Sequence, residues 1–163
     1  MRVKVAVLVS GGGTNLQALL DANLQHGEIA FVLSNRKAAY ALERARARGV
    51  ETAVLSNVME PDPVRRDEKL LEMLRARGIQ VVALAGYLGI LGEKTVSAYE
   101  NRIVNIHPAL IPSFCGKGYY GLRVHEAALA RGVKLTGATV HLVNEECDGG
   151  PILLQKAVAV EPG

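Results

Sequence analysis

The chain has 163 residues, of which 49% are hydrophobic and 21% charged, with a formal net charge of +3. This size and balance are typical of a globular domain with a core of its own, and they exclude a disordered chain or a coiled coil. No apolar run approaches the roughly 20 residues that cross a bilayer, and the first run is broken by Lys4, which does not fit a secretion signal. We therefore expect a cytoplasmic protein that does not bind membranes.

The first part of the chain alternates apolar strands with helices. The pattern predicts strands at 3–9, 29–33, 54–55 and 80–85, and helices at 15–26, 38–48 and 63–77. Strands of nearly continuous Val, Ile and Leu that alternate with helices indicate a parallel sheet with helices on both faces.

The second part of the chain differs in its composition and in the order of its predicted elements. A strand at 102–107 is followed by a loop rich in Gly, Pro and Tyr, a helix at 122–131, and strands at 135–143 and 152–160. The last two strands are joined by a segment containing Asp148-Gly149-Gly150, a strong hairpin signal. We predict one Rossmann-like α/β domain over residues 1–163, with a mostly parallel central sheet and a C-terminal β-hairpin. In such sheets, ligands bind beyond the carboxyl ends of the strands.

A glycine-rich turn, Ser10-Gly11-Gly12-Gly13-Thr14-Asn15, follows the first strand. Its backbone N–H groups and the helix dipole behind it favour an anion. The Gly-Lys-Ser/Thr ending of a Walker A loop is absent, and Leu16 stands where the dinucleotide fingerprint needs its third glycine. The acidic ribose ligand of that fingerprint is also replaced, by Ser34-Asn35. We predict a site for the phosphate of a smaller ligand, and a turn that binds nothing is the alternative.

Asn105 and His107 lie at the end of the strand at 102–107, two positions apart and therefore on one face. An amide can stabilise a developing oxyanion and an imidazole can transfer a proton, which are the two functions that acyl transfer needs. Pro108 then fixes the backbone as the chain leaves the strand. Asp148 is the best candidate for an acidic partner of His107. Asp-Gly is also common in plain hairpin turns, so the local sequence favours the two interpretations equally.

Other motifs favour no metal or nucleic-acid site. Cys115 and Cys147 lack CxxC spacing, and a catalytic thiol at Cys115 has no sequence signature. Leu129 replaces the second histidine of an HExxH motif at His125, which leaves His125 as a helix-start or pocket residue. The net charge suits a small anionic substrate, while arginines on helices without interleaved aromatics argue against nucleic acid.

Four motifs in this order and spacing, SGGGTN, LAGYLGIL, NIHPALIPSF and TVHLVNEECDGGPILLQ, resemble the phosphoribosylglycinamide formyltransferase family from Val3 to about Val160. The resemblance implies transfer of a formyl group from 10-formyltetrahydrofolate, the co-substrate, to the amine of glycinamide ribonucleotide in de novo purine (IMP) biosynthesis. It also implies that no metal takes part.

The resemblance assigns roles by position. The catalytic residues would be Asn105, His107 and Asp148. The ribonucleotide and its phosphate would be bound by Gly12, Gly13, Thr14, Asn15 and Pro108. The folate would be bound by Leu88, Gly89, Ile90, Leu91, Asn105, Asn144, Glu145, Glu146, Cys147 and Asp148.

The chain departs from the family pattern in three places. Many relatives have Arg or another long residue where Gly89 stands, so we expect a folate contact to be missing or made by backbone. The insert at 115–121 is longer than in some relatives, and its Lys117 could approach the ribose phosphate or remain in solvent. The family also continues for several tens of residues past this hairpin, so we expect the C-terminal helix to be lacking.

Three alternatives stay open from the sequence. The enzyme could formylate another amine, such as an amino sugar nucleotide. The chain could also be a nucleotide-binding module without chemistry, or a degenerate structural subunit. The oligomeric state is not predicted.

Overall fold

The structure, a computed structural model, describes residues 1–163. The chain divides into two compact units, Met1–Ile103 and Val104–Gly163, which we call the N-terminal and C-terminal units. No helix combines the length and the apolar character that a membrane crossing requires.

The N-terminal unit alternates strands and helices as predicted. Its elements are β1 (Val3–Val9), α1 (Thr14–Asp21), β2 (Gly27–Ser34), α2 (Ala41–Ala47), β3 (Glu51–Val54), α3 (Pro63–Ala76), β4 (Val81–Leu84) and α4 (Glu93–Ala98). The strands lie in the order β3-β2-β1-β4, and every neighbouring pair is parallel. The predicted parallel arrangement is therefore confirmed in this unit.

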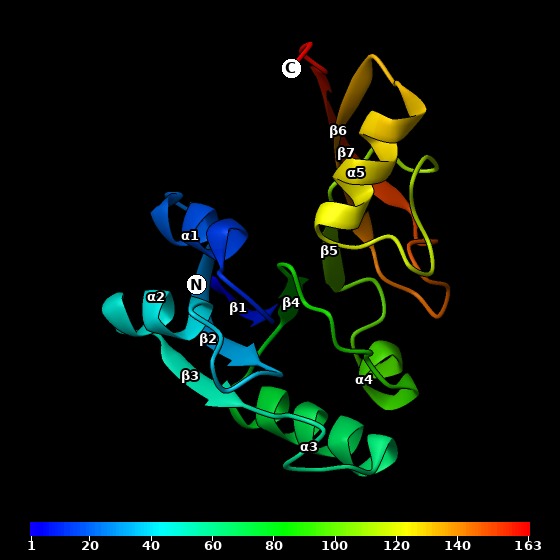
Figure 1. The fold of residues 1–163 in the computed structure, drawn as a ribbon. Helices are drawn as coiled ribbons and strands as arrows, with labels where there is room; N and C mark the ends of the chain where they lie inside the picture. The colour runs from blue at the N-terminus through cyan, green and yellow to red at the C-terminus, as the bar shows by residue number, and fades with distance from the viewer. The chain divides into compact units, whose positions relative to one another are not determined.

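Helices pack on both faces of these strands (Figure 1). On one face, Leu16 of α1 and Leu42 of α2 join Val7, Val9 and Val32 in a buried cluster. Each such side chain stabilises the fold by roughly 1.5–3 kcal/mol when fully buried. On the opposite face lies α3, and Arg77 at its C-terminal end stacks 4.2 Å over the Phe31 ring of β2.

Two aspartates set the positions of α3 and α4. Asp62 caps α3 by accepting hydrogen bonds from the N–H groups of Val64 and Arg65. Asp67 is only 7% exposed and accepts from the N–H groups of Gly92, Lys94 and Thr95. The start of α4 therefore depends on a buried carboxylate of α3. The sequence did not predict α4, because six residues are too few to show a helical period.

The C-terminal unit contains β5 (Ile103–His107, of which the first residue belongs to the N-terminal unit), α5 (Leu122–Arg131), β6 (Leu135–Leu142) and β7 (Ile152–Ala159). β5 pairs with β6 and β6 with β7, both antiparallel. The predicted C-terminal hairpin is therefore confirmed. A loop between β5 and α5 contains the cis peptide bond Ile111-Pro112.

Candidate active site

The register of β5 against β6 builds a polar cluster in the C-terminal unit. Asn105 pairs with His141 and His107 pairs with Thr139. In both strands the two polar residues are separated by one apolar residue, so all four side chains share one face. His107, Thr139 and His141 are at most 4% exposed. A buried polar face of this kind requires hydrogen-bond partners for each group.

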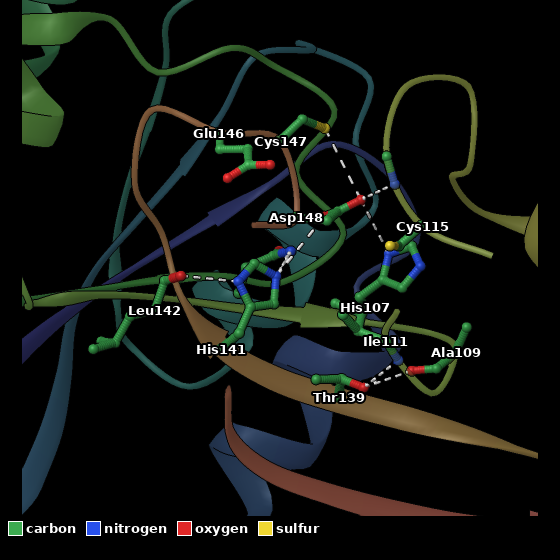
Figure 2. Close-up of polar contacts among 12 residues, drawn as sticks. His107, Ala109, Ile111, Cys115, Thr139, His141, Leu142, Glu146, Cys147 and Asp148 are labelled. Carbon is green, nitrogen blue, oxygen red and sulfur yellow. Dashed lines mark hydrogen bonds and ion pairs between the residues drawn. The ribbon is translucent and has the colours of Figure 1, made fainter. Parts of the chain in front are cut away.

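His107 is held between a backbone carbonyl and a carboxylate. Figure 2 shows the carboxylate, that of Asp148, between the rings of His107 and His141. Its Nε2 lies 2.7 Å from the carbonyl oxygen of Phe114, and because a carbonyl only accepts, Nε2 carries a proton. Its Nδ1 lies 3.7 Å from Oδ2 of Asp148. When both nitrogens are protonated, each therefore faces an acceptor.

Asp148 lies between two imidazoles. Its Oδ2 faces His107 and accepts a 2.9 Å hydrogen bond from the N–H of Gly116, while its Oδ1 lies 3.8 Å from Nε2 of His141. The side chain is only 12% exposed. Asp148 has a φ of 53°, so in this hairpin it is the aspartate, and neither of the glycines after it, that adopts the left-handed conformation.

His141 joins Asn105 to Asp148. Its Nδ1 lies 2.9 Å from the carbonyl oxygen of Leu142 and must donate to it. In the neutral ring, Nε2 is then an acceptor, and Nδ2 of Asn105 donates to it at 3.1 Å. An amide nitrogen has two protons, so one N–H of Asn105 remains for another partner.

His141 was not among the residues predicted from the sequence. The signal was present, because Thr139-Val140-His141 repeats the polar, apolar, polar pattern of Asn105-Ile106-His107. Only the antiparallel register, however, shows that the two patterns face each other. Thr139 has a structural part: its hydroxyl donates to the carbonyl oxygen of Ala109 and accepts from the N–H of Ile111.

The two thiols lie near Asp148 but are not activated. Cys147 Sγ is 3.9 Å from Oδ2 of Asp148, and Cys115 Sγ contacts the carbonyl oxygen of Pro112 at 3.3 Å. Burial raises the pKa of both thiols, and the negative charge of Asp148 raises each pKa further. A raised pKa reduces the thiolate fraction, so the structure favours no catalytic thiol.

Three other residues of the predicted folate loop are not part of this hydrogen-bonded cluster. Asn144, Glu145 and Glu146 are exposed, and Oδ1 of Asn144 accepts from the N–H of Glu146 in a local turn. None of the three hydrogen-bonds to the histidines. Lys117 and His125 are also exposed. No group of three or more His, Cys, Asp or Glu side chains is arranged to hold a metal ion.

In the N-terminal unit, the predicted phosphate turn follows β1. Gly13 has a φ of 80° and directly precedes α1, without a side-chain cap. The N–H groups of Gly12, Gly13, Thr14 and Asn15 have no hydrogen-bond acceptor among residues 1–103. Donors without partners at a helix start suit an anion.

Ser10 connects this turn to two other segments of the same unit. It is 2% exposed; its hydroxyl donates to Oδ1 of Asn35 at 2.6 Å and accepts from the N–H of Leu88 at 2.7 Å. The predicted folate segment, which begins at Leu88, is therefore anchored next to the glycine turn. Leu88 and Ile90 are 46% and 91% exposed.

Position 89 has little room for a side chain in this structure. A Cβ on Gly89 would lie 2.4 Å from the Tyr87 ring, which occupies that space. Burial raises the pKa of the Tyr87 hydroxyl, with a smaller contribution from Asp67 and an opposing one from Arg66. The phenol therefore remains protonated at neutral pH.

A cavity of about 270 Å³ in the N-terminal unit is not this site. Its walls include Arg2, Leu20, Glu28 and Arg48. Arg2 directly precedes β1 and Glu28 lies at the amino end of β2, whereas the glycine turn follows the carboxyl end of β1. The chemistry-bearing residues do not line it.

Comparison with known proteins gives consistent matches. The profile of the formyl transferase family matches residues 3–163. The chain is 41% identical to a chloroplastic phosphoribosylglycinamide formyltransferase of Arabidopsis thaliana, over 98% of this chain and 56% of the plant protein. It is 40% identical to the phosphoribosylglycinamide formyltransferase of Escherichia coli K12, over 99% of this chain and 75% of that protein.

A solved structure agrees with the fold. Glycinamide ribonucleotide transformylase 1 of Symbiobacterium toebii superposes with a TM-score of 0.91 at 43% identity, covering 99% of this chain and 75% of that one. The predicted α/β formyltransferase fold is thereby confirmed. The chain spans little more than half the length of its plant relative and three quarters of the bacterial ones.

Proposed function

Because this chain belongs to the formyl transferase family, we propose that it transfers a formyl group from 10-formyltetrahydrofolate to the amine of glycinamide ribonucleotide, a step of purine biosynthesis. The names of the Arabidopsis and E. coli relatives support this choice of acceptor. We also propose that residues 1–163 form one formyltransferase domain, since the family match is continuous from 3 to 163.

The observation that carries the proposal is the carboxylate of Asp148 between two buried imidazoles, one of which hydrogen-bonds the amide of Asn105. A module that only binds a nucleotide has no need of this arrangement. Buried charged and polar groups are costly unless they are paired, so such clusters concentrate at functional sites.

The reaction forms one C–N bond and breaks another. The acceptor amine attacks the formyl carbon, forming a C–N bond and a tetrahedral adduct whose oxygen carries the negative charge. The adduct then collapses: the bond from carbon to N10 of the folate breaks, and a proton passes from the attacking nitrogen to the leaving one.

The side chains divide this work. The second N–H of Asn105 donates to the developing oxyanion, and the first keeps the amide oriented against His141. The positive charge of protonated His107 stabilises the same oxyanion without a hydrogen bond to it, because the two N–H groups of the ring face the carbonyl of Phe114 and the carboxylate of Asp148. The gap of 3.7 Å between His107 and Asp148 is longer than a hydrogen bond, and catalytic contacts often tighten only when substrate binds.

Binding is assigned to separate segments. We propose that the amides of Gly12, Gly13, Thr14 and Asn15 hold the acceptor phosphate, and that Pro108 borders the ribonucleotide. The folate would contact the backbone of Leu88, Gly89, Ile90 and Leu91 and the loop from Asn144 to Asp148. The exposed apolar side chains of Leu88 and Ile90 support a contact with an aromatic ligand.

Removal of Asn105 tests the proposal. In a formyl-transfer assay with glycinamide ribonucleotide, Asn105→Ala should lower kcat by about 10²–10³, because it removes an oxyanion donor. His125→Ala, an exposed residue of α5, is the control and should retain full activity. Nearly full activity of Asn105→Ala would refute the assigned role. A wild-type protein that formylates only an amino sugar nucleotide would refute the acceptor.

A further inference from the structure

The first residues of α2 hold two carbonyl groups of the glycine turn. The N–H of Ala41 donates to the carbonyl oxygen of Gly11 at 3.0 Å, and Nε of Arg44 donates to that of Gly12 at 2.7 Å. Two consecutive peptide groups of the turn are thus fixed from the same side, one by backbone and one by a side chain.

Because the trans peptide group is planar, a contact that fixes the direction of its C=O also fixes the direction of its N–H. In each peptide group the C=O and the following N–H point in opposite directions. Because the carbonyls of Gly11 and Gly12 are directed at α2, the N–H groups of Gly12 and Gly13 point away from it. These are the N–H groups that lack an acceptor among residues 1–103.

Arg44 is itself held in place. Its Nη1 donates to Oε1 of Gln17 on α1 at 3.2 Å, and its guanidinium lies 5.0 Å from the centre of the Tyr40 ring. It forms no ion pair within residues 1–103, unlike Arg46, which pairs with Glu43 on the same helix. The half-buried guanidinium therefore places an uncompensated positive charge beside the turn.

We propose that Arg44 is a positioning residue that makes the glycine turn selective for a phosphorylated acceptor. It keeps the carbonyl of Gly12 turned toward α2, so that the amides are presented to the phosphate, and its charge favours a dianion. This inference rests on the proposed function, because that function assigns the phosphate to the turn.

The test compares two acceptors with three variants. Arg44→Met keeps the aliphatic stem but removes the donors and the charge, and it should raise the KM for glycinamide ribonucleotide about tenfold, in line with a charged hydrogen bond. The kcat and the KM for formyl folate should stay within about twofold. Arg44→Lys keeps the charge without the fixed Nε donor, so it should fall between Arg44→Met and wild type. Arg46→Met is the matched control and should not change either KM.

The decisive readout is the preference for glycinamide ribonucleotide over its dephosphorylated riboside. Arg44→Met should reduce this preference, measured as the ratio of kcat/KM values, about tenfold. An equal loss with both acceptors would mean a purely structural role and would overturn the proposal. So would an unchanged ratio.

Calorimetric titration with inorganic phosphate separates this proposal from the proposed function. Wild type should bind phosphate about tenfold more tightly than Arg44→Met, whether or not the protein turns over glycinamide ribonucleotide. Absence of turnover with this difference intact would refute only the proposed function, and equal binding by both would refute the role of Arg44. If Arg44→Met has a clearly lower melting temperature than wild type, the acceptor preference and the phosphate affinity of Arg44→Lys are compared with those of wild type instead.

Discussion

The candidate functional groups of the two units are of different chemical kinds. In the N-terminal unit the candidate groups are main-chain amides of a glycine-rich turn that follows a parallel strand. In the C-terminal unit they are an amide, two imidazoles and a carboxylate on antiparallel strands and a hairpin loop. The difference predicts that mutations of the turn glycines act through backbone geometry, and mutations of the C-terminal polar cluster through charge and proton transfer.

The largest effect should come from removing the charge of Asp148. Asp148→Asn preserves shape and can still accept from the N–H of Gly116, so the loop should keep its conformation. The kcat of formyl transfer should nevertheless fall by about 10²-fold or more, since general acid–base and electrostatic contributions are of this size. Both KM values should change little.

The control for this variant is Asp21→Asn, which alters an exposed carboxylate paired with Arg48. It should leave kcat unchanged. If Asp148→Asn kept most of its turnover, the charge-based role assigned to the C-terminal polar cluster would be wrong.

An intermediate effect is expected from a single methyl group in the glycine turn. At Gly13 a Cβ would lie 2.6 Å from Cβ of Ala41, and φ is 80°. Gly13→Ala should lower the free energy of unfolding by about 1–2 kcal/mol for the left-handed backbone and about 1–3 kcal/mol for overpacking. Denaturant unfolding measures this loss.

Gly11→Ala is the matched control for Gly13→Ala. It adds the same methyl group two residues earlier, where φ is not positive and no atom lies within 4 Å of the new Cβ. Its stability should be close to that of wild type. Equal stability of the two variants would show that the turn is not constrained as described.

The smallest effect concerns the thiol of Cys147. Burial and then the charge of Asp148 raise its pKa, so alkylation should increase with pH through a midpoint above the ordinary thiol value. In a Cys115→Ser background, Asp148→Asn should increase the alkylation rate at pH 8 by about twofold to fivefold, because removing one nearby negative charge increases the thiolate fraction. An unchanged alkylation rate would show that the carboxylate of Asp148 does not raise the pKa of the Cys147 thiol.

The sequence predicted the repeating parts of the fold better than its short elements. Continuous apolar runs identified β1, β2 and β4, and the Asp-Gly-Gly signal identified the hairpin of β6 and β7. The predicted helix at 15–26 is wrong beyond Asp21, because Ala22 is extended and β2 already begins at Gly27. The predicted helix at 38–48 begins only at Ala41.

In the candidate site, residues with a local sequence signal could be predicted, and residues placed by long-range contacts could not. Asn105, His107 and Asp148 could be proposed from their own positions, at the end of a strand and in a turn, and the structure gathers them in one unit around His141. His141 could not be proposed in this way, because its place depends on the register between β5 and β6. The contact of Arg44 with Gly12 likewise joins residues 32 positions apart, beyond any local pattern.

The left-handed backbone at Phe114 and Asp148 has a consequence for engineering. Both residues have φ near 50°, and both contact His107. Such conformations cost of order 1–3 kcal/mol each when the residue is not glycine. A laboratory selection for heat resistance alone would therefore reward glycine or asparagine at these two positions. The contact of Phe114 with His107 is made by a backbone carbonyl and would remain, whereas replacement of Asp148 would remove the carboxylate that faces His107. Any such selection should therefore screen turnover in parallel.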